Sequence, residues 1–199
     1  MEKKVEQGKT KATRRPRSDA LRNRQRLVDA ARVIFATGGP DASLEAVARR
    51  ADVGIGTLYR HFPTRDVLFE TVYRSEVDDV VALAERLSRT DEPMAALAAW
   101  LRANVDLVAT KKGMLAALAL AADGRAQLYA DSLARLSTAA DLLMERARDD
   151  GLIRSDIEAE ELLRSLVGTC HMTPDGRTWR ADVMRLMDVF LDGLRVRAA

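Results

Sequence analysis

The stretch Val53-Gly54-Ile55-Gly56-Thr57-Leu58-Tyr59-Arg60-His61-Phe62 decides how the rest of the chain is interpreted. Leu58 and Phe62 are four residues apart, so on a helix they share one face that can pack against a core. The remaining face is polar and consists of Thr57, Tyr59, Arg60 and His61. The stretch therefore predicts a short helix with a buried inner side and an outer side rich in hydrogen-bond donors.

A second short helix is predicted directly before this stretch. Its apolar residues recur at the spacing i, i+3, i+4 and i+7 of an amphipathic helix, and they are Leu44, Val47, Ala48 and Ala51. Ser43 stands at the N-cap position, and Asp52-Val53-Gly54 predicts a tight break. Two short helices joined by such a turn, the second with a polar outer face, are typical of a helix-turn-helix.

The run from Leu44 to Leu68 resembles the DNA-binding signature of the TetR family of transcriptional regulators. The matching residues are Ala48, Ala51, Val53, Gly56-Thr57-Leu58-Tyr59, His61-Phe62, Arg65 and Leu68. The resemblance implies an all-α fold of about nine helices, with an N-terminal three-helix helix-turn-helix domain and a C-terminal helical domain for ligand binding and dimerisation. We expect a disordered basic arm over residues 1–17, the helix-turn-helix domain over 18–63 and the ligand-binding and dimerisation domain over 64–199.

Positive charge is concentrated at the N-terminal end of the chain. Residues 1–26 hold ten basic and three acidic residues, whereas the whole chain has a net charge of only +2. A concentration of positive charge is what binding to a polyanion requires. The alternative is a solvated tail, but beside a helix-turn-helix we favour contact with DNA.

The resemblance also implies roles for individual residues. Ser43, Tyr59, His61 and Arg65 match positions that usually contact phosphates, whereas the residues around Thr57 face the base edges. The glycines in this set let the backbone approach closely and leave fewer side chains for base contacts, which favours shape readout. As alternatives, His61 only packs and Arg65 is a solvated helix-start residue. The predicted DNA-binding set is Arg15, Arg17, Ser43, Gly54, Ile55, Gly56, Thr57, Tyr59, Arg60, His61 and Arg65.

Beyond residue 64, turn signals divide the chain into further amphipathic helices. A long helix over 65–88 would connect the DNA-binding unit rigidly to the remainder. Later helices are predicted to begin near Pro93, at Met114, after Gly124, after a capping box at Ser155-Asp156-Ile157-Glu158 and after the turn Thr173-Pro174-Asp175-Gly176. The predicted breaks are Lys111-Lys112-Gly113, Asp123-Gly124 and Gly151.

A regulator of this family needs a ligand pocket and a dimer interface. The pocket candidates are mostly large and apolar with a few polar groups, although any one of them is more often plain core. They are Trp100, Asn104, Met114, Leu118, Tyr129, Leu133, Leu136, Met144, Cys170, His171 and Trp179. The last two helices are expected to pair with their copies, or else merely to close the monomer core. Their predicted interface residues are Leu163, Leu166, Val167, Val183, Leu186, Met187, Phe190 and Leu194.

Other classes of protein find little support in the sequence. The only cysteine, Cys170, and the adjacent His171 would diverge on a helix, so neither a metal site nor a cofactor is expected. No catalytic motif, signal peptide or membrane-spanning run is recognised, which predicts a cytoplasmic protein that is not an enzyme. We therefore expect a homodimeric repressor that binds an inverted-repeat operator on double-stranded DNA and is released by a hydrophobic small molecule. The alternatives are a constitutive DNA binder that only dimerises through its C-terminal domain, and a sensor or carrier that has lost DNA binding.

Overall fold

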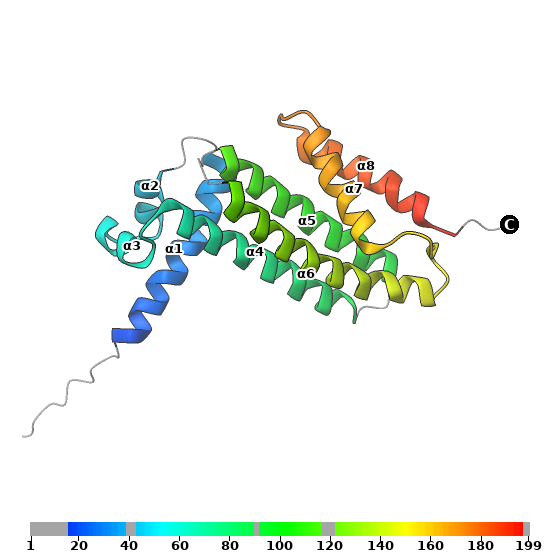
Figure 1. Ribbon diagram of the computed structural model, residues 1–199, viewed down its shortest axis with the longest axis horizontal. Helices are drawn as coiled ribbons and strands as arrows, with labels where there is room; N and C mark the ends of the chain where they lie inside the picture. The colour runs from blue at the N-terminus through cyan, green and yellow to red at the C-terminus, as the bar shows by residue number, and fades with distance from the viewer. Residues whose placement is uncertain (1–15, 39–42, 90–91, 117–121, 197–199) are drawn as a thin grey trace, which may run out of the picture.

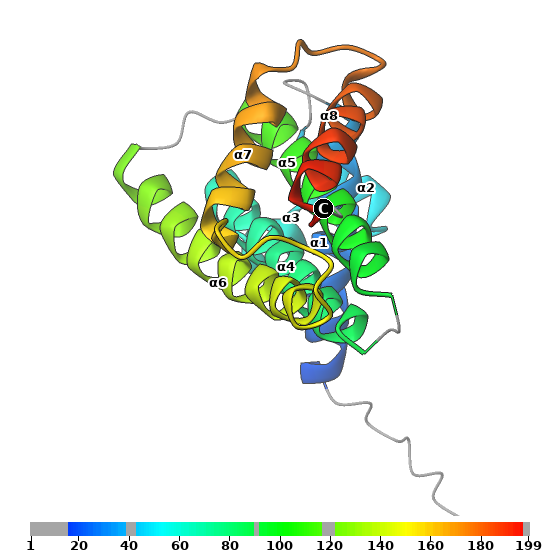
Figure 2. The ribbon, with the colours of Figure 1, turned by 90° about the vertical axis from the view of Figure 1, so that its right-hand side faces the viewer.

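The computed structural model describes residues 16–38, 43–89, 92–116 and 122–196, and these residues form an all-helical protein, as predicted. Its eight helices are α1 (Pro16–Gly38), α2 (Leu44–Arg50), α3 (Ile55–His61), α4 (Arg65–Leu87), α5 (Pro93–Ala116), α6 (Ala122–Asp149), α7 (Ala159–Met172) and α8 (Trp179–Leu194). The first three helices gather at one end, and α4, α5 and α6 run lengthwise away from them (Figure 1). Helices α7 and α8 lie side by side against the bundle, α7 on α6 and α8 on α5 (Figure 2).

The predicted helix-turn-helix is present at the N-terminal end. Ser43 caps α2, because its hydroxyl oxygen accepts the Ala46 N–H at 3.1 Å. Leu58 and Phe62 of α3 are completely buried, as is Leu27 of α1. Helix α3 has only seven residues, too few to be stable in isolation, so its position depends on this apolar contact with α1 and α2.

The turn between α2 and α3 has a defined hydrogen-bond pattern. The Asp52 N–H donates to the Arg49 carbonyl at 3.2 Å, and the Val53 N–H donates to the Ala48 carbonyl at 3.1 Å. This is a Schellman motif, which needs a left-handed residue at the position after the C-cap. Asp52 occupies that position with a φ of 54°, where many helices have glycine. The exposed pair between Arg26 and Asp52, 3.1 Å apart, ties the turn to α1.

Helix α4 extends from the helix-turn-helix unit into the centre of the bundle. The Thr64 hydroxyl accepts the Val67 N–H at 3.2 Å and thereby caps the helix, which begins at Arg65. Leu68 and Val72 are fully buried at this end. Farther along, the indole N–H of Trp100 on α5 donates to the Val80 carbonyl at 3.0 Å. The predicted long connecting helix is therefore confirmed.

Three predicted boundaries differ in the structure. Helix α6 begins at Ala122, so the break predicted at Asp123-Gly124 lies within its first turn. Helix α5 continues through Lys111-Lys112-Gly113 to Ala116, because lysine favours helix and a single glycine costs only about 1 kcal/mol. No separate helix begins at Met114, so the described residues hold eight helices rather than about nine. The cap of α7 lies three residues beyond Ser155, since the Glu161 carboxylate accepts the Glu158 N–H at 2.9 Å.

Other predicted boundaries are confirmed or moved slightly. Gly151 ends α6 in the left-handed conformation, with a φ of 68°, as predicted. Helix α1 begins at Pro16 rather than near Ser18, consistent with the preference of proline for the first helical position. Residues 1–15 of the predicted arm lie outside the described residues.

The left-handed conformation of Asp52 yields a prediction about stability. We expect Asp52→Gly to keep the free energy of unfolding within about 1 kcal/mol of wild type, because glycine adopts this conformation freely. Asp52→Val should lower it by about 1–2 kcal/mol, since a β-branched residue is strained there. Urea denaturation of the three proteins measures both values. A valine variant as stable as the glycine variant would contradict the assignment.

Candidate functional site

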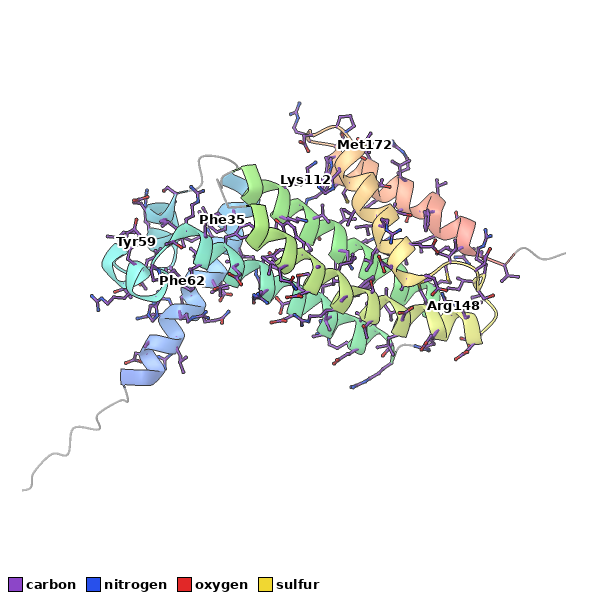
Figure 3. All side chains as sticks on the ribbon, in the orientation of Figure 1. Phe35, Tyr59, Phe62, Lys112, Arg148 and Met172 are labelled. Carbon is purple, nitrogen blue, oxygen red and sulfur yellow. The ribbon has the colours of Figure 1, made fainter. Side chains whose placement is uncertain are left out.

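The outer face of α3 is exposed and mostly polar. Tyr59 is 46% exposed and Ile55 39% exposed, whereas Phe62 is buried on the opposite side (Figure 3). Arg60 is also exposed, and Thr57 and His61 are partly exposed. The predicted division of this stretch into an apolar inner face and a polar outer face is therefore confirmed.

The two glycines at the start of α3 leave its N-terminus bare. A Cβ atom added to Gly54 or Gly56 would meet no protein atom within 4 Å. Gly54 has a φ of −66°, an ordinary conformation for any residue. Packing within the protein does not explain why either residue is glycine, and backbone strain does not explain it at Gly54. The missing side chains allow another molecule to approach the N–H groups at the start of this helix closely.

Two arginines lie against aromatic rings near this face. The guanidinium carbon of Arg65 is 5.8 Å from the centroid of Phe35, and that of Arg24 is 5.1 Å from the centroid of Phe62. Arg24 was not among the predicted contacts, because no sequence pattern pairs α1 with α3. Arg49 and Arg50 at the end of α2 are exposed as well, and Arg50 lines a groove with Arg26 and Asp29 of α1. Arg15 and the side chain of Arg17 lie outside the described residues.

A cavity of about 180 Å³ lies among α4, α5, α6 and α7. Its lining includes four of the predicted ligand residues: Asn104, Tyr129, Leu133 and Leu136. It also includes Leu163, Leu166 and Val167, which were predicted for a dimer interface. Sequence reasoning missed Tyr73, Leu107, Val108 and Lys111, of which Lys111 was interpreted as part of a helix break.

The other predicted ligand residues do not line this cavity. Trp100, Met144 and Cys170 are completely buried in the core, and burial raises the pKa of the Cys170 thiol to about 11. Trp179 packs at the start of α8, where its indole N–H donates to the Cys170 carbonyl at 3.1 Å. His171 is exposed, with its Nδ1 2.8 Å from the Val167 carbonyl oxygen. The side chains of Met114 and Leu118 lie outside the described residues.

Three exposed apolar side chains lie at the end of α7 and on the outer side of α8. Met172 is 83% exposed, Val189 67% and Leu186 47%, and Met172 stands at the outer end of α7 (Figure 3). An open groove of about 570 Å³ runs beside Met172 and Leu186. Of the other residues predicted for a dimer interface, Val183, Met187 and Leu194 are buried, because this stripe of α8 packs within the chain, partly against α5. Phe190 is half-buried.

Comparisons with known proteins agree with this architecture. A family model described as the C-terminal domain of SbtR-like transcriptional regulators matches residues 92–196, and one described as bacterial regulatory proteins of the tetR family matches 27–72. The chain belongs to the TetR family of transcriptional regulators. The predicted family and fold are thereby confirmed, and the helix-turn-helix is the DNA-binding unit of such a regulator.

Solved structures resemble this TetR-family chain over most of its length. The TetR transcriptional regulator SCO0520 from Streptomyces coelicolor is 39% identical, with a TM-score of 0.75 over 88% of this chain and 99% of that one. A TetR regulatory protein from Mycobacterium vanbaalenii is 32% identical, with a TM-score of 0.67 over 90% of this chain and 99% of that one.

The HTH-type transcriptional repressor KstR from Mycolicibacterium smegmatis is 41% identical over 71 residues, which cover 35% of each chain. The chain thus matches only about a third of the length of this curated relative.

Two features are absent from the part of the chain that the structure describes. No helix in this part is long and apolar enough to cross a membrane. No group of three or more histidine, cysteine, aspartate or glutamate residues in this part could hold a metal ion.

Arg32 connects α1 of the helix-turn-helix unit to α4 of this TetR-family regulator. From α1 its guanidinium donates to the Ser75 hydroxyl at 2.9 Å and pairs with Asp79 at 2.8 Å, both on α4. Its Nε is 3.7 Å from the Glu76 carboxylate, too far for a strong hydrogen bond. Burial raises the pKa of Glu76 to about 7, although Arg32 and a hydrogen bond from Thr110 lower it.

This raised pKa predicts that stability depends on pH. The folded protein retains the Glu76 proton up to about pH 7, whereas the unfolded chain releases it near the ordinary pKa of 4.5. The contribution to stability is therefore complete below about pH 4.5 and is lost as the pH rises through about 7. We expect Glu76→Gln to remove this dependence and to raise the free energy of unfolding at pH 8 by about 3 kcal/mol.

Chemical denaturation between pH 5 and pH 8 measures the effect. Glu70→Gln is the matched control, because Glu70 lies on the same helix but is exposed and paired with Arg74. Parallel pH profiles for wild type and Glu76→Gln would show that Glu76 does not hold its proton in the folded state.

Proposed function

We propose that this chain is a dimeric repressor that binds an inverted-repeat operator through α3 and is released from it by a small ligand. The observation that carries the proposal is the exposed polar face of α3, presented by the burial of Leu58 and Phe62. The α3 helix of each protomer would enter the major groove, and a dimer would place the two helices about one turn of DNA, roughly 34 Å, apart.

The chemistry of the α3 face supports specific roles. Tyr59, His61 and Arg65 can donate to phosphate oxygens, and the bare N-terminus of α3 suits an anion. Thr57 and Arg60 can contact base edges, Arg60 by a forked hydrogen bond to guanine. Ser43 uses its hydroxyl oxygen to cap α2, which still leaves the hydroxyl proton for a phosphate.

Release by a ligand is supported by the position of the cavity. Tyr73 lines the cavity and lies on α4, two and three residues before Ser75 and Glu76, which face Arg32 of α1. A ligand that displaces α4 would therefore also displace α1. Two DNA-binding units at the wrong separation cannot both occupy their grooves, so the ligand would shift the population toward a form that does not bind DNA.

Binding to the DNA upstream of its own gene tests the proposal directly. Fluorescence anisotropy with that duplex, a scrambled duplex of equal length and a series of salt concentrations should show tight, sequence-selective binding with two chains per operator. Equal, steeply salt-dependent binding to both duplexes would contradict an operator at that position.

Gly56→Ala separates DNA binding from folding. The added methyl group meets no protein atom within 4 Å, and alanine favours helix, so stability should be unchanged or higher by up to about 1 kcal/mol. Affinity for the operator should nevertheless fall at least about 10-fold, because the methyl group occupies the space into which the DNA must come. Anisotropy and thermal denaturation provide the two readouts, and Gly176→Ala, in the loop before α8, is the matched control. Unchanged operator affinity in Gly56→Ala would contradict close approach at this residue.

The exposed apolar face of α7 and α8 is the proposed dimer interface. Replacing Val189 by aspartate should convert the dimer to monomers, because the interface would bury an unpaired charge. The same change at Leu142, an exposed residue of α6, is the control and should leave the dimer intact. Light scattering coupled to size-exclusion chromatography gives the masses. Dimers that persist in Val189→Asp would place the interface elsewhere.

A further inference from the structure

Lys111 is a cation in a cavity whose other lining residues are uncharged. It lies in the last part of α5, half-buried, with its ammonium nitrogen 3.6 Å from the centroid of the Tyr129 ring. The remaining lining consists of Tyr73, Asn104, Leu107, Val108, Tyr129, Leu133, Leu136, Leu163, Leu166 and Val167. Among the described residues of this lining, Lys111 therefore supplies the only formal charge.

The neighbouring lysine shows how such a charge is usually compensated. The ammonium group of Lys112 pairs with Asp175 at 2.6 Å and donates to the Cys170 carbonyl at 3.3 Å. Consecutive helical residues point about 100° apart, so Lys112 faces α7 and the following loop whereas Lys111 faces the cavity. Among the side chains that the structure describes, no carboxylate forms an ion pair with Lys111. Burial also lowers the pKa of Lys111, a sign that the ammonium group is not compensated there.

The rest of the cavity is suited to a compact apolar group. Its aromatic part is the edge-to-face pair Tyr73–Tyr129, with ring centroids 5.5 Å apart, and leucine and valine side chains form much of the rest. The Asn104 amide group donates to the Trp100 carbonyl at 2.9 Å and is thereby oriented within the wall. An apolar cavity of about 150 Å³ accommodates benzene. A volume of about 180 Å³ therefore accommodates one ring, or a short branched chain, with a small substituent.

We propose that this cavity binds a small apolar monocarboxylic acid, with the apolar part among the leucines and tyrosines and the carboxylate paired with Lys111. A carboxylate supplies the missing counter-charge, and one such group is enough because the lining offers one cation. The inference rests on the proposed ligand-released function and specifies the chemical class of the ligand.

Pairs of acids and their neutral amides test the proposal on the wild-type protein. Benzoate and 4-methylpentanoate are compared with benzamide and 4-methylpentanamide by isothermal titration calorimetry and thermal shift. The acids should bind at least about 10-fold more tightly than the amides, since a charge-assisted hydrogen bond is lost with the amide. Amides that bind as well as the acids, or no binding of either acid at about 5 mM, overturn the proposal.

Substitution of the lysine tests the assignment of the carboxylate. Lys111→Met should weaken acid binding about 10- to 100-fold and leave amide binding unchanged, whereas Lys111→Arg should retain most of the affinity for acids. Lys112→Met, in the next residue of the same helix, should have no effect on the preference for acids. Because the comparison of acid with amide needs no variant, an unstable Lys111→Met protein does not prevent the test. Equal acid affinity in Lys111→Met and wild type would overturn the assignment.

Operator release distinguishes this inference from the proposed function. Each acid is added to the protein bound to labelled operator, and anisotropy is followed. Acid binding that depends on Lys111 but leaves the DNA bound would retain the acid site and refute ligand release. DNA release by a neutral apolar compound without binding of the acids would retain ligand release and refute the acid site.

Discussion

Helix α4 runs through one continuous hydrophobic core, from the helix-turn-helix unit into the bundle, and this position constrains the rest of the architecture. Leu68 and Phe69 are buried at the end that follows the helix-turn-helix, and Tyr73 lines the cavity about one turn later. The rings of Phe69 and Tyr73 are stacked, with centroids 6.3 Å apart. Because interiors are close-packed, a change of position at Tyr73 cannot be absorbed within one turn without moving Phe69. In the proposed mechanism, the length and continuity of α4 would tie the position of α3 to the filling of the cavity.

Local signals in the sequence were enough to predict several helix ends, whereas the arrangement of the helices was predicted from the family resemblance. Ser43, Thr64 and Gly151 act on backbone groups within four residues of themselves, so their effects on helix ends can be predicted without knowledge of the tertiary structure. The turn at Asp52 and the inner face formed by Leu58 and Phe62 could also be predicted from residues close together in the sequence. The predicted capping box at Ser155 was wrong, because Glu158 and Glu161 form the box three residues later, and glutamate is not among the usual N-cap residues.

The cavity could be predicted only in part, because apolar residues that fill a core and those that line a cavity look alike in a sequence. Trp100 and Leu133 were equally good candidates, and the arrangement of neighbouring helices alone decides that Trp100 is core. The same limit applies to the last two helices, where Leu163 and Val167 were predicted for a dimer interface and line the cavity. Lys111 was missed for a different reason. A charged pair before a glycine resembles a break, and its orientation depends on α5 continuing beyond it.

Thr110 and Lys111, consecutive residues of α5, belong to two different series of contacts with α4 and α1. Lys111 contacts Tyr129, which contacts Tyr73 on α4, whereas Thr110 is hydrogen-bonded to Glu76, which faces Arg32 on α1. A ligand changes the equilibrium between two conformations only by the difference in its affinity for them. A cavity of about 180 Å³ offers little apolar area to a ligand, so burial alone gives a small difference. An ion pair with Lys111 depends steeply on distance, and it can therefore be strong in one conformation of α5 and weak in another. For a cavity of this size, charge is thus the more effective means of coupling ligand binding to the position of α3.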